Sequence, residues 1–218
     1  MTVTDFANTE LDPPVQGYLH QPESPVVASL VLTHGAGGNA AQILLVTLAE
    51  AFAEKGFAVL RYDLPFRQAR PYGPPRPADG RRDQQGLRNA VAAIRQQFPG
   101  KVYLGGQSYG GRQASMLLAD DARAADGLLL LSYPLHPPNK PDQLRIQHLP
   151  KLYVPTMFVS GTKDPFGTTS EIEAARKLIR SKTQVVMIEG VGHDLGVKSK
   201  TGSDLPMIVC ENFLRFFT

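Results

Sequence analysis

The sequence has one cysteine, no tryptophan and no long apolar run. Because a single cysteine, Cys210, cannot form an intrachain disulfide, we expect a reducing compartment, and we predict the cytoplasm. No apolar stretch approaches the ~18 residues that cross a bilayer, so we predict no membrane segment. The first residues also lack a basic stretch followed by an apolar one, which predicts no secretory signal.

Metal and nucleotide motifs are missing as well. There is no H-E-x-x-H sequence and no cysteine pair, so we assign no metal and no other cofactor. The segment THGAGGN, residues 33–39, is rich in glycine. It has neither the G-x-G-x-x-G spacing nor the lysine of a phosphate loop, which makes it a poor nucleotide site.

The positive charge of the chain is concentrated in residues 61–95. Eight arginines stand there against three aspartates, a net of +5 in a chain whose total is +3. Solvated arginines on a loop and a helix explain this excess, and attraction of an acidic substrate or partner is the alternative. Dispersed arginines without an aromatic-rich motif do not indicate a nucleic-acid partner.

Strand and helix patterns alternate from about residue 26 onward, in a chain whose length suits one domain over residues 1–218. Such alternation predicts an α/β fold, a mostly parallel sheet with helices on both faces. We expect the first ~25 residues to add one or two antiparallel edge strands. The runs that we interpret as buried strands include 26–35, 57–65, 127–134 and 155–164.

Local signals mark helix starts and loops. Asn39 is a candidate N-cap for the first helix, and Ser170 with Glu173 forms a capping-box pattern. Residues 66–80 and 135–150 are proline-rich connections. The second is too short to hold a large helical cap, so we expect an open, shallow site.

Four polar segments each follow a predicted strand. In an open parallel sheet, ligands bind beyond the carboxyl ends of the strands. The segments should therefore converge at one edge of the sheet. They are THGAGGN, GGQSYGG, SGTKDPFG and EGVGHD.

The sequence GQSYG, residues 106–110, has the G-x-S-x-G pattern of a nucleophile elbow between a strand and a helix. Ser108 is the candidate nucleophile, and it needs a base to remove its proton. His193 has the right chain order and follows the last strand. Asp164 follows the preceding strand and is the candidate acid, with Asp194 as the competitor.

The other histidines receive structural interpretations. His34 lies in the first glycine turn, where we expect it to brace the loop by hydrogen bonding. His136 and His148 lie in the second proline-rich connection, where we expect surface positions, although His136 is also a candidate for lining the pocket. His20 lies near the N-terminus on an expected edge strand.

Two backbone N–H groups should bind the oxyanion of the transition state, and we assign them to Tyr109 and Ala36. Arg67 and Arg70 are candidates for binding an anionic group of the substrate. Arg112, one turn into the helix after Ser108, is expected to face the site, to support the loop or to form a buried pair.

Taken together, LTHGAGGN, RYDLPFR, GGQSYGGR, YPLHPPNKPDQLRIQHLP, VSGTKDPFG and EGVGHD resemble the α/β-hydrolase superfamily. Within it they are similar to the dienelactone-hydrolase-like set, including the testis-expressed hydrolase-like proteins and the hydrolase-like domain of a chromatin-acetylation complex subunit. The likeness covers about residues 14–217. It departs from true dienelactone hydrolases at Ser108, where those enzymes have cysteine, and members of the set generally lack an assigned substrate.

We therefore predict a serine hydrolase of esterase or thioesterase type, acting on a small-molecule substrate through Ser108, His193 and Asp164. The alternative is a hydrolase-fold module that binds a partner with little or no catalysis. The sequence does not indicate an oligomeric state.

Overall fold

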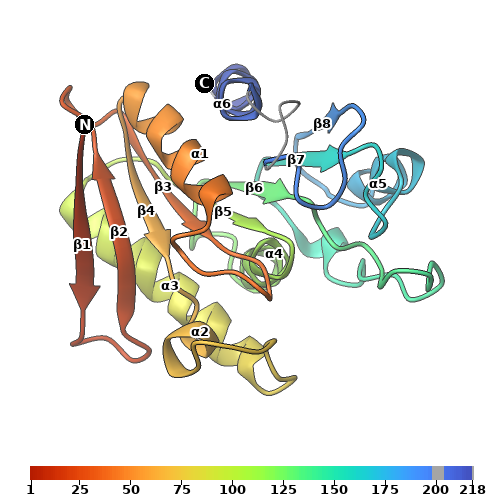
Figure 1. Cartoon of the computed structure of the whole chain (residues 1–218), viewed down its shortest axis with the longest axis horizontal. Helices are drawn as coiled ribbons and strands as arrows, with labels where there is room; N and C mark the ends of the chain where they lie inside the picture. The colour runs from red at the N-terminus through yellow and green to blue at the C-terminus, as the bar shows by residue number, and fades with distance from the viewer. Residues whose placement is uncertain (198–203, 218) are drawn as a thin grey trace.

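The computed structural model of the chain describes residues 1–197 and 204–217. In this part, eight strands form one sheet in the order β1-β2-β4-β3-β5-β6-β7-β8 (Figure 1). The strands are β1 (Thr2–Asn8), β2 (Val15–Gln21), β3 (Ala28–Thr33), β4 (Phe57–Tyr62), β5 (Val102–Gln107), β6 (Gly127–Leu131), β7 (Thr156–Gly161) and β8 (Thr183–Ile188).

The sheet is mostly parallel, as the sequence predicted. Strands β3 to β8 run parallel to one another, whereas β2 pairs antiparallel with β4, and β1 pairs antiparallel with β2 at the edge. The register of β3 and β5 places Thr33 opposite Gly106. The two glycine-rich turns that follow these strands therefore begin side by side at the carboxyl edge of the sheet.

Helices cover both faces of this sheet (Figure 1). Alternation along a strand sends successive side chains to opposite faces. Leu128 and Leu130 of β6 therefore pack in the core beneath α3, α4 and α5, while Leu129 and Leu131 pack in the core beneath α1 and α6. The helices are α1 (Ile43–Glu54), α2 (Pro65–Ala69), α3 (Asp79–Gln97), α4 (Tyr109–Asp120), α5 (Thr169–Arg176) and α6 (Leu205–Phe217).

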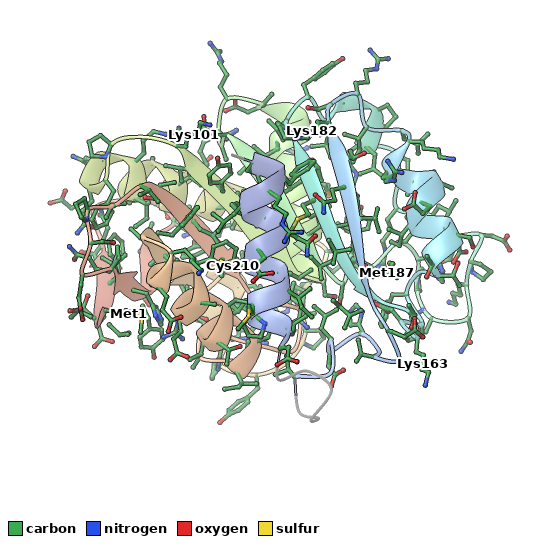
Figure 2. All side chains as sticks on the ribbon, turned by 90° about the horizontal axis from the view of Figure 1, so that it is seen from above. Met1, Lys101, Lys163, Lys182, Met187 and Cys210 are labelled. Atoms are coloured by element: carbon green, nitrogen blue, oxygen red, sulfur yellow. The ribbon has the colours of Figure 1, made fainter. Side chains whose placement is uncertain are left out.

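Cys210 lies on α6, which crosses the face of the sheet beside α1 (Figure 2). Its side chain is buried, and its Sγ lies 3.8 Å from the carbonyl oxygen of Ala51. Burial raises the pKa of this thiol to about 11, so Cys210 behaves as a small core residue. Within the described ranges, none of the helices has the length and apolar character needed to cross a bilayer.

Two predicted helix starts are wrong. Asn39 does not cap α1, because the chain first makes a turn, in which the Asn39 side chain accepts from the Ala41 N–H, and the helix begins at Ile43. The capping box of α5 is formed by Thr168 and Glu171, two residues before the predicted pair. The Thr168 hydroxyl accepts from the Glu171 N–H at 3.4 Å, and the Glu171 carboxylate accepts from the Thr168 N–H at 2.8 Å.

The segment between β6 and β7 carries a single described helical turn, the 3-10 helix η1 (Leu149–Lys151). As the sequence predicted, no large cap domain is inserted there, and the carboxyl edge of the sheet is covered by loops.

Candidate active site

Ser108 stands in the sharp turn between β5 and α4, with φ of 49° and ψ of −115°. A non-glycine residue with positive φ is strained, and such strain is found where a side chain must be held in place. The turn needs close backbone contacts on both sides. A Cβ added at Gly106 would lie 2.6 Å from the Gly111 nitrogen, and one at Gly110 would lie 2.4 Å from the His34 carbonyl oxygen.

The structure brings Ser108, His193 and Asp164 together at the carboxyl edge of the sheet. The His193 Nε2 atom lies 2.9 Å from the Ser108 Oγ. The His193 Nδ1 atom lies 2.8 Å and 3.0 Å from the two carboxylate oxygens of Asp164. Three residues that are far apart in the sequence thus form one hydrogen-bonded chain from hydroxyl to carboxylate.

Phe166, which the sequence analysis did not single out, holds both partners of Ser108. Its ring centroid lies 4.1 Å from that of the His193 imidazole, at an interplanar angle of 31°. Its backbone N–H donates to Asp164 Oδ1 at 2.9 Å. The Asp164 side chain is only 2% exposed, so the carboxylate has little access to water. The DPFG turn therefore fixes both the acid and the histidine ring.

The competing acid, Asp194, lies beside His193 in the cavity wall. Its Oδ1 accepts a hydrogen bond from the Gly196 N–H at 3.0 Å. The imidazole nitrogen that is available for an acid is already bonded to Asp164. The geometry therefore favours Asp164 over Asp194 as the partner of His193.

The other histidines outside the first glycine turn bond elsewhere. Buried His20 accepts from the Nε of Arg61 at 2.7 Å, and burial together with that arginine lowers its pKa to about 4. His136 is buried, against our expectation of a surface position. It lies 3.4 Å from Glu171, because its loop folds down onto the start of α5. His148 is half-buried against α4.

The structure places Tyr109 and Ala36, our candidate oxyanion donors, beside Ser108. Tyr109 is the first residue of α4, and the first N–H groups of a helix have no partner within it and carry its positive dipole end. The turn after β3 approaches the serine closely, since a Cβ added at Gly35 would lie 3.4 Å from the Ser108 Cβ. Ala36, the next residue, lines the same cavity as Ser108.

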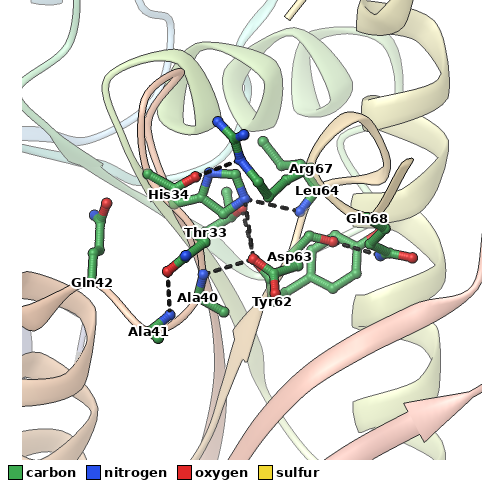
Figure 3. A network of polar contacts seen from close by, with 12 residues as sticks. Thr33, His34, Ala40, Ala41, Gln42, Tyr62, Asp63, Leu64, Arg67 and Gln68 are labelled. Carbon is green, nitrogen blue, oxygen red and sulfur yellow. Dashed lines mark hydrogen bonds and ion pairs between the residues drawn. The ribbon is translucent and has the colours of Figure 1, made fainter. Parts of the chain in front are cut away.

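The His34 ring, which Figure 3 shows beside Asp63 and Leu64, fixes the peptide between Gly35 and Ala36. The Leu64 N–H donates to His34 Nε2 at 3.1 Å, so Nδ1 carries the proton and donates to the Gly35 carbonyl at 2.8 Å. In a trans peptide the C=O and the following N–H point in opposite directions. Holding the Gly35 carbonyl toward His34 therefore turns the Ala36 N–H away from His34. Burial lowers the pKa of His34, which keeps the ring neutral.

Arg67 secures the same turn through its guanidinium group (Figure 3). The side chain is buried, and all five of its N–H donors bond to backbone carbonyls. The acceptors are Gly38 at 2.8 Å, Ala36 at 2.9 Å, Pro71 at 2.7 Å, Gly73 at 3.1 Å and Arg70 at 3.2 Å. One side chain thus joins the glycine turn after β3 to the proline-rich connection after α2.

This geometry argues against the expectation that Arg67 and Arg70 bind the substrate. Arg67 has no N–H left for a ligand, and Arg70 is paired with Asp79 at 2.5 Å. Aspartates from outside residues 61–95 neutralise much of the remaining positive charge of that segment. These pairs are Arg82–Asp12 at 2.6 Å, Arg88–Asp121 at 3.3 Å and Arg95–Asp126 at 3.0 Å.

We predict that Arg67→Gln lowers kcat by about 10-fold to 100-fold with a smaller change in KM, because the turn that carries the Ala36 N–H loses its hydrogen bonds at the Ala36 and Gly38 carbonyls. The carbonyls left without donors should also lower the free energy of unfolding by about 2–4 kcal/mol. Steady-state kinetics and urea unfolding measure the two effects. Arg81→Gln, which replaces an exposed arginine of the same segment, is the control. Equal kinetics for the two variants would show that Arg67 does not support the site.

A buried carboxyl group, Asp83, ties the serine turn to α2. Its Oδ2 accepts from the Tyr109 hydroxyl at 2.6 Å, and its Oδ1 accepts from the Phe66 N–H at 3.0 Å. Burial is the largest cause that raises the pKa of Asp83, to about 6. Because the folded state holds this proton more tightly than the unfolded chain, stability from this group is greatest at low pH and is lost as the pH rises.

We therefore predict that the wild-type protein loses stability relative to Asp83→Asn as the pH rises from 4 to 7. The full difference is about 3 kcal/mol, from a shift of roughly two pKa units. Urea unfolding of both proteins at steps across this range measures it. Parallel pH profiles for the two proteins would show that Asp83 does not titrate in this way.

Ser108 opens into a cavity of about 480 Å³. Part of its wall is apolar and comes from the start of α1 and from the turns near His193, namely Ile43, Leu44, Phe166 and Val197. Gln42 and Gln107 add a polar contact in the wall, with the Gln42 Nε2 donating to the Gln107 Oε1 at 2.6 Å. In the ranges that the structure covers, no group of three His, Cys, Asp or Glu side chains is placed to hold a metal ion.

A parallel sheet in this strand order, with a strained serine between β5 and α4, defines the α/β-hydrolase fold. The profile of a family described as an alpha/beta hydrolase domain matches residues 26–214. The chain therefore belongs to the alpha/beta hydrolase family, and the predicted resemblance is confirmed.

Solved structures show the same fold. The chain is similar to an alpha-beta serine hydrolase homologue from Coxiella burnetii, with a TM-score of 0.74 and 18% identity over 100% of this chain and 99% of that one. It is also similar to a dienelactone hydrolase from Anabaena variabilis, with a TM-score of 0.74 and 18% identity over 100% of both chains. For Est1E from Butyrivibrio proteoclasticus, the TM-score is 0.74 and the identity is 18%, over 99% of this chain and 98% of that one.

Proposed function

We propose that this hydrolase cleaves a small to medium carboxylic ester or thioester through an acyl-enzyme on Ser108, with residues 1–218 acting as one catalytic domain. The observation that carries the proposal is the continuous hydrogen-bonded chain from the Ser108 Oγ through His193 to Asp164. A hydroxyl in this arrangement can lose its proton to the imidazole as it attacks, which is what makes serine an effective nucleophile.

In the proposed mechanism, the Ser108 Oγ attacks the acyl carbon while His193 Nε2 accepts the hydroxyl proton. Asp164 stabilises the imidazolium that forms. The amides of Ala36 and Tyr109 donate to the oxyanion. His193 then returns the proton to the leaving oxygen or sulfur, and the bond to the leaving group breaks. Water then attacks the acyl-enzyme while His193 takes its proton, the bond between the acyl carbon and the Ser108 Oγ breaks, and His193 returns the proton to that oxygen as the acid leaves. These steps need no cofactor.

The shape of the site supports a substrate with an apolar part. The cavity beside Ser108 is open, and Ile43, Leu44 and Val197 contribute apolar side chains to its wall. An acyl or alcohol group of moderate size would bury apolar surface there. The carboxylate of Asp194 in the same wall disfavours an anionic group at that position.

A panel of p-nitrophenyl esters and acyl thioesters, from acetate to dodecanoate, tests the proposed activity. We expect saturable hydrolysis with an optimum at short to medium chains and no requirement for added metal. Rates equal to those of heat-inactivated protein across the whole panel would contradict it.

A further inference from the structure

Two arginines, Arg112 of α4 and Arg145 of the second proline-rich connection, are half-buried. Neither forms an ion pair with an acidic side chain in the part of the chain that the structure describes. They differ in this from Arg70, Arg82, Arg88 and Arg95, each of which has an aspartate.

Hydrogen bonds order the backbone around each arginine, and the contact between Ser115 and His148 joins α4 to the second proline-rich connection. The Tyr133 hydroxyl donates to the Arg145 carbonyl at 2.7 Å, and Arg145 itself donates to the Pro134 carbonyl at 3.1 Å. On the α4 side, the Ser115 hydroxyl bonds to the Arg112 carbonyl at 2.8 Å, and the His148 ring lies 2.8 Å from the same hydroxyl. The segment from Tyr133 to His148 is therefore fastened against the first turns of α4.

The electrostatics around Arg112 and Arg145, the arginine cluster, are those of cations that face one another. Burial and then the charge of Arg112 lower the pKa of Arg145. The same two causes, in that order, lower the pKa of His148 to about 4, so its ring is neutral at pH 7. The exposed carboxylate of Asp120 lies near His148 and opposes this lowering of the His148 pKa. Like charges withdrawn from water are unfavourable unless an anion compensates them.

Arg112 also has an unmet donor. Its Nε is buried and has no hydrogen-bond partner, whereas nearly all buried N–H groups in folded proteins have one. A planar guanidinium binds the oxygens of a carboxylate or phosphate through two parallel hydrogen bonds. An oxyanion between the two arginines would satisfy this donor and neutralise the cluster in one step.

We propose that Arg112 and Arg145 bind an anionic group, a carboxylate or a phosphate, and that this group is part of the substrate cleaved at Ser108. The second half of this statement rests on the proposed function. Arg112 follows Ser108 by four residues, about 6 Å along the helix axis. A short linker between the ester and the anionic group therefore suits the site, as in a half-ester of a small dicarboxylic acid.

Thermal unfolding tests the anion site without reference to catalysis. Sodium phosphate, compared with sodium chloride at equal ionic strength, should raise the Tm of the wild-type protein by about 3 °C, through binding to the folded state. Arg112→Gln and Arg145→Gln should abolish this rise, and Arg123→Gln, an exposed arginine just after α4, should keep it.

The same experiment separates a binding role from a structural one. In chloride alone, Arg112→Gln should be at least as stable as the wild type, because it removes an unpaired cation that faces another cation. A lower Tm in chloride, or an equal phosphate response in Arg112→Gln and the wild type, would overturn the anion site.

Kinetics test whether the anion belongs to the substrate. For mono-p-nitrophenyl glutarate, Arg112→Gln should lower kcat/KM by 10-fold or more, and for p-nitrophenyl valerate by less than 3-fold. Equal effects on both esters, with a phosphate response intact in the wild type, would overturn the substrate assignment in favour of a site for free anions. If the wild type hydrolyses neither ester, the proposed function fails, and the Tm experiment still decides the anion site.

Discussion

Replacing Ser108 with alanine is expected to lower kcat/KM for ester hydrolysis by about 10⁴-fold or more, close to the background rate. In enzymes that use such a triad, removing the nucleophile costs nearly as much as removing the whole triad. The substitution deletes only the Oγ that lies 2.9 Å from His193 Nε2, and alanine keeps a side chain of the same branching at the strained φ of 49°. The fold should therefore be unchanged.

Kinetics with the most reactive ester of the panel, together with circular dichroism, check this prediction. Ser24→Ala, at an exposed serine far along the chain from the site, is the matched control and should retain wild-type activity. Residual activity within 10-fold of the wild type in Ser108→Ala would mean that another residue carries the reaction.

Asp164→Asn is expected to lower kcat by about 10⁴-fold with little change in stability. The Asp164 Oδ1 accepts from the Phe166 N–H, which fixes the amide oxygen of an asparagine at the same place. Its NH₂ group then occupies the position of Oδ2, 2.8 Å from His193 Nδ1. His193 Nδ1 must then accept a hydrogen bond from this NH₂ group instead of donating one, so the imidazole proton moves to Nε2. With Nε2 protonated, the imidazole can no longer accept the proton of Ser108.

Asp194→Asn provides the comparison for this substitution, because it removes a neighbouring carboxylate without touching His193 Nδ1. We expect it to retain kcat within 10-fold of the wild type. If Asp194→Asn and Asp164→Asn had equal effects on kcat, the assignment of the acid to Asp164 would be wrong.

The sheet could be predicted from the sequence because its signal is local. Runs such as residues 127–134 are apolar at every position, as strands buried on both faces must be, and glycines or prolines mark their ends. The positions of Ser108, Asp164 and His193 follow from the same pattern. Each comes after a strand, and parallel strands bring their carboxyl ends to one edge.

What could not be predicted depends on long-range contacts. Nothing near Arg67 in the sequence indicates that carbonyls of residues 36 and 38 would take its donors, since the pairing of β3 with β4 brings them together. The burial of His136 likewise follows from the packing of its loop against α5. The predicted start of α5 was wrong for a local reason. Thr168 and Ser170 both precede an acidic residue by three positions, and only the backbone decides between them.

The serine hydrolase account rests on an activated Ser108, and the most direct measurement is its covalent labelling by a fluorophosphonate probe. Intact-mass spectrometry of the treated wild-type protein should show one adduct, and peptide mapping should place it on Ser108. Ser108→Ala should remain unlabelled. An unlabelled wild type, or equal labelling of Ser108→Ala, would contradict the account and leave a hydrolase-fold binding module as the function of this chain.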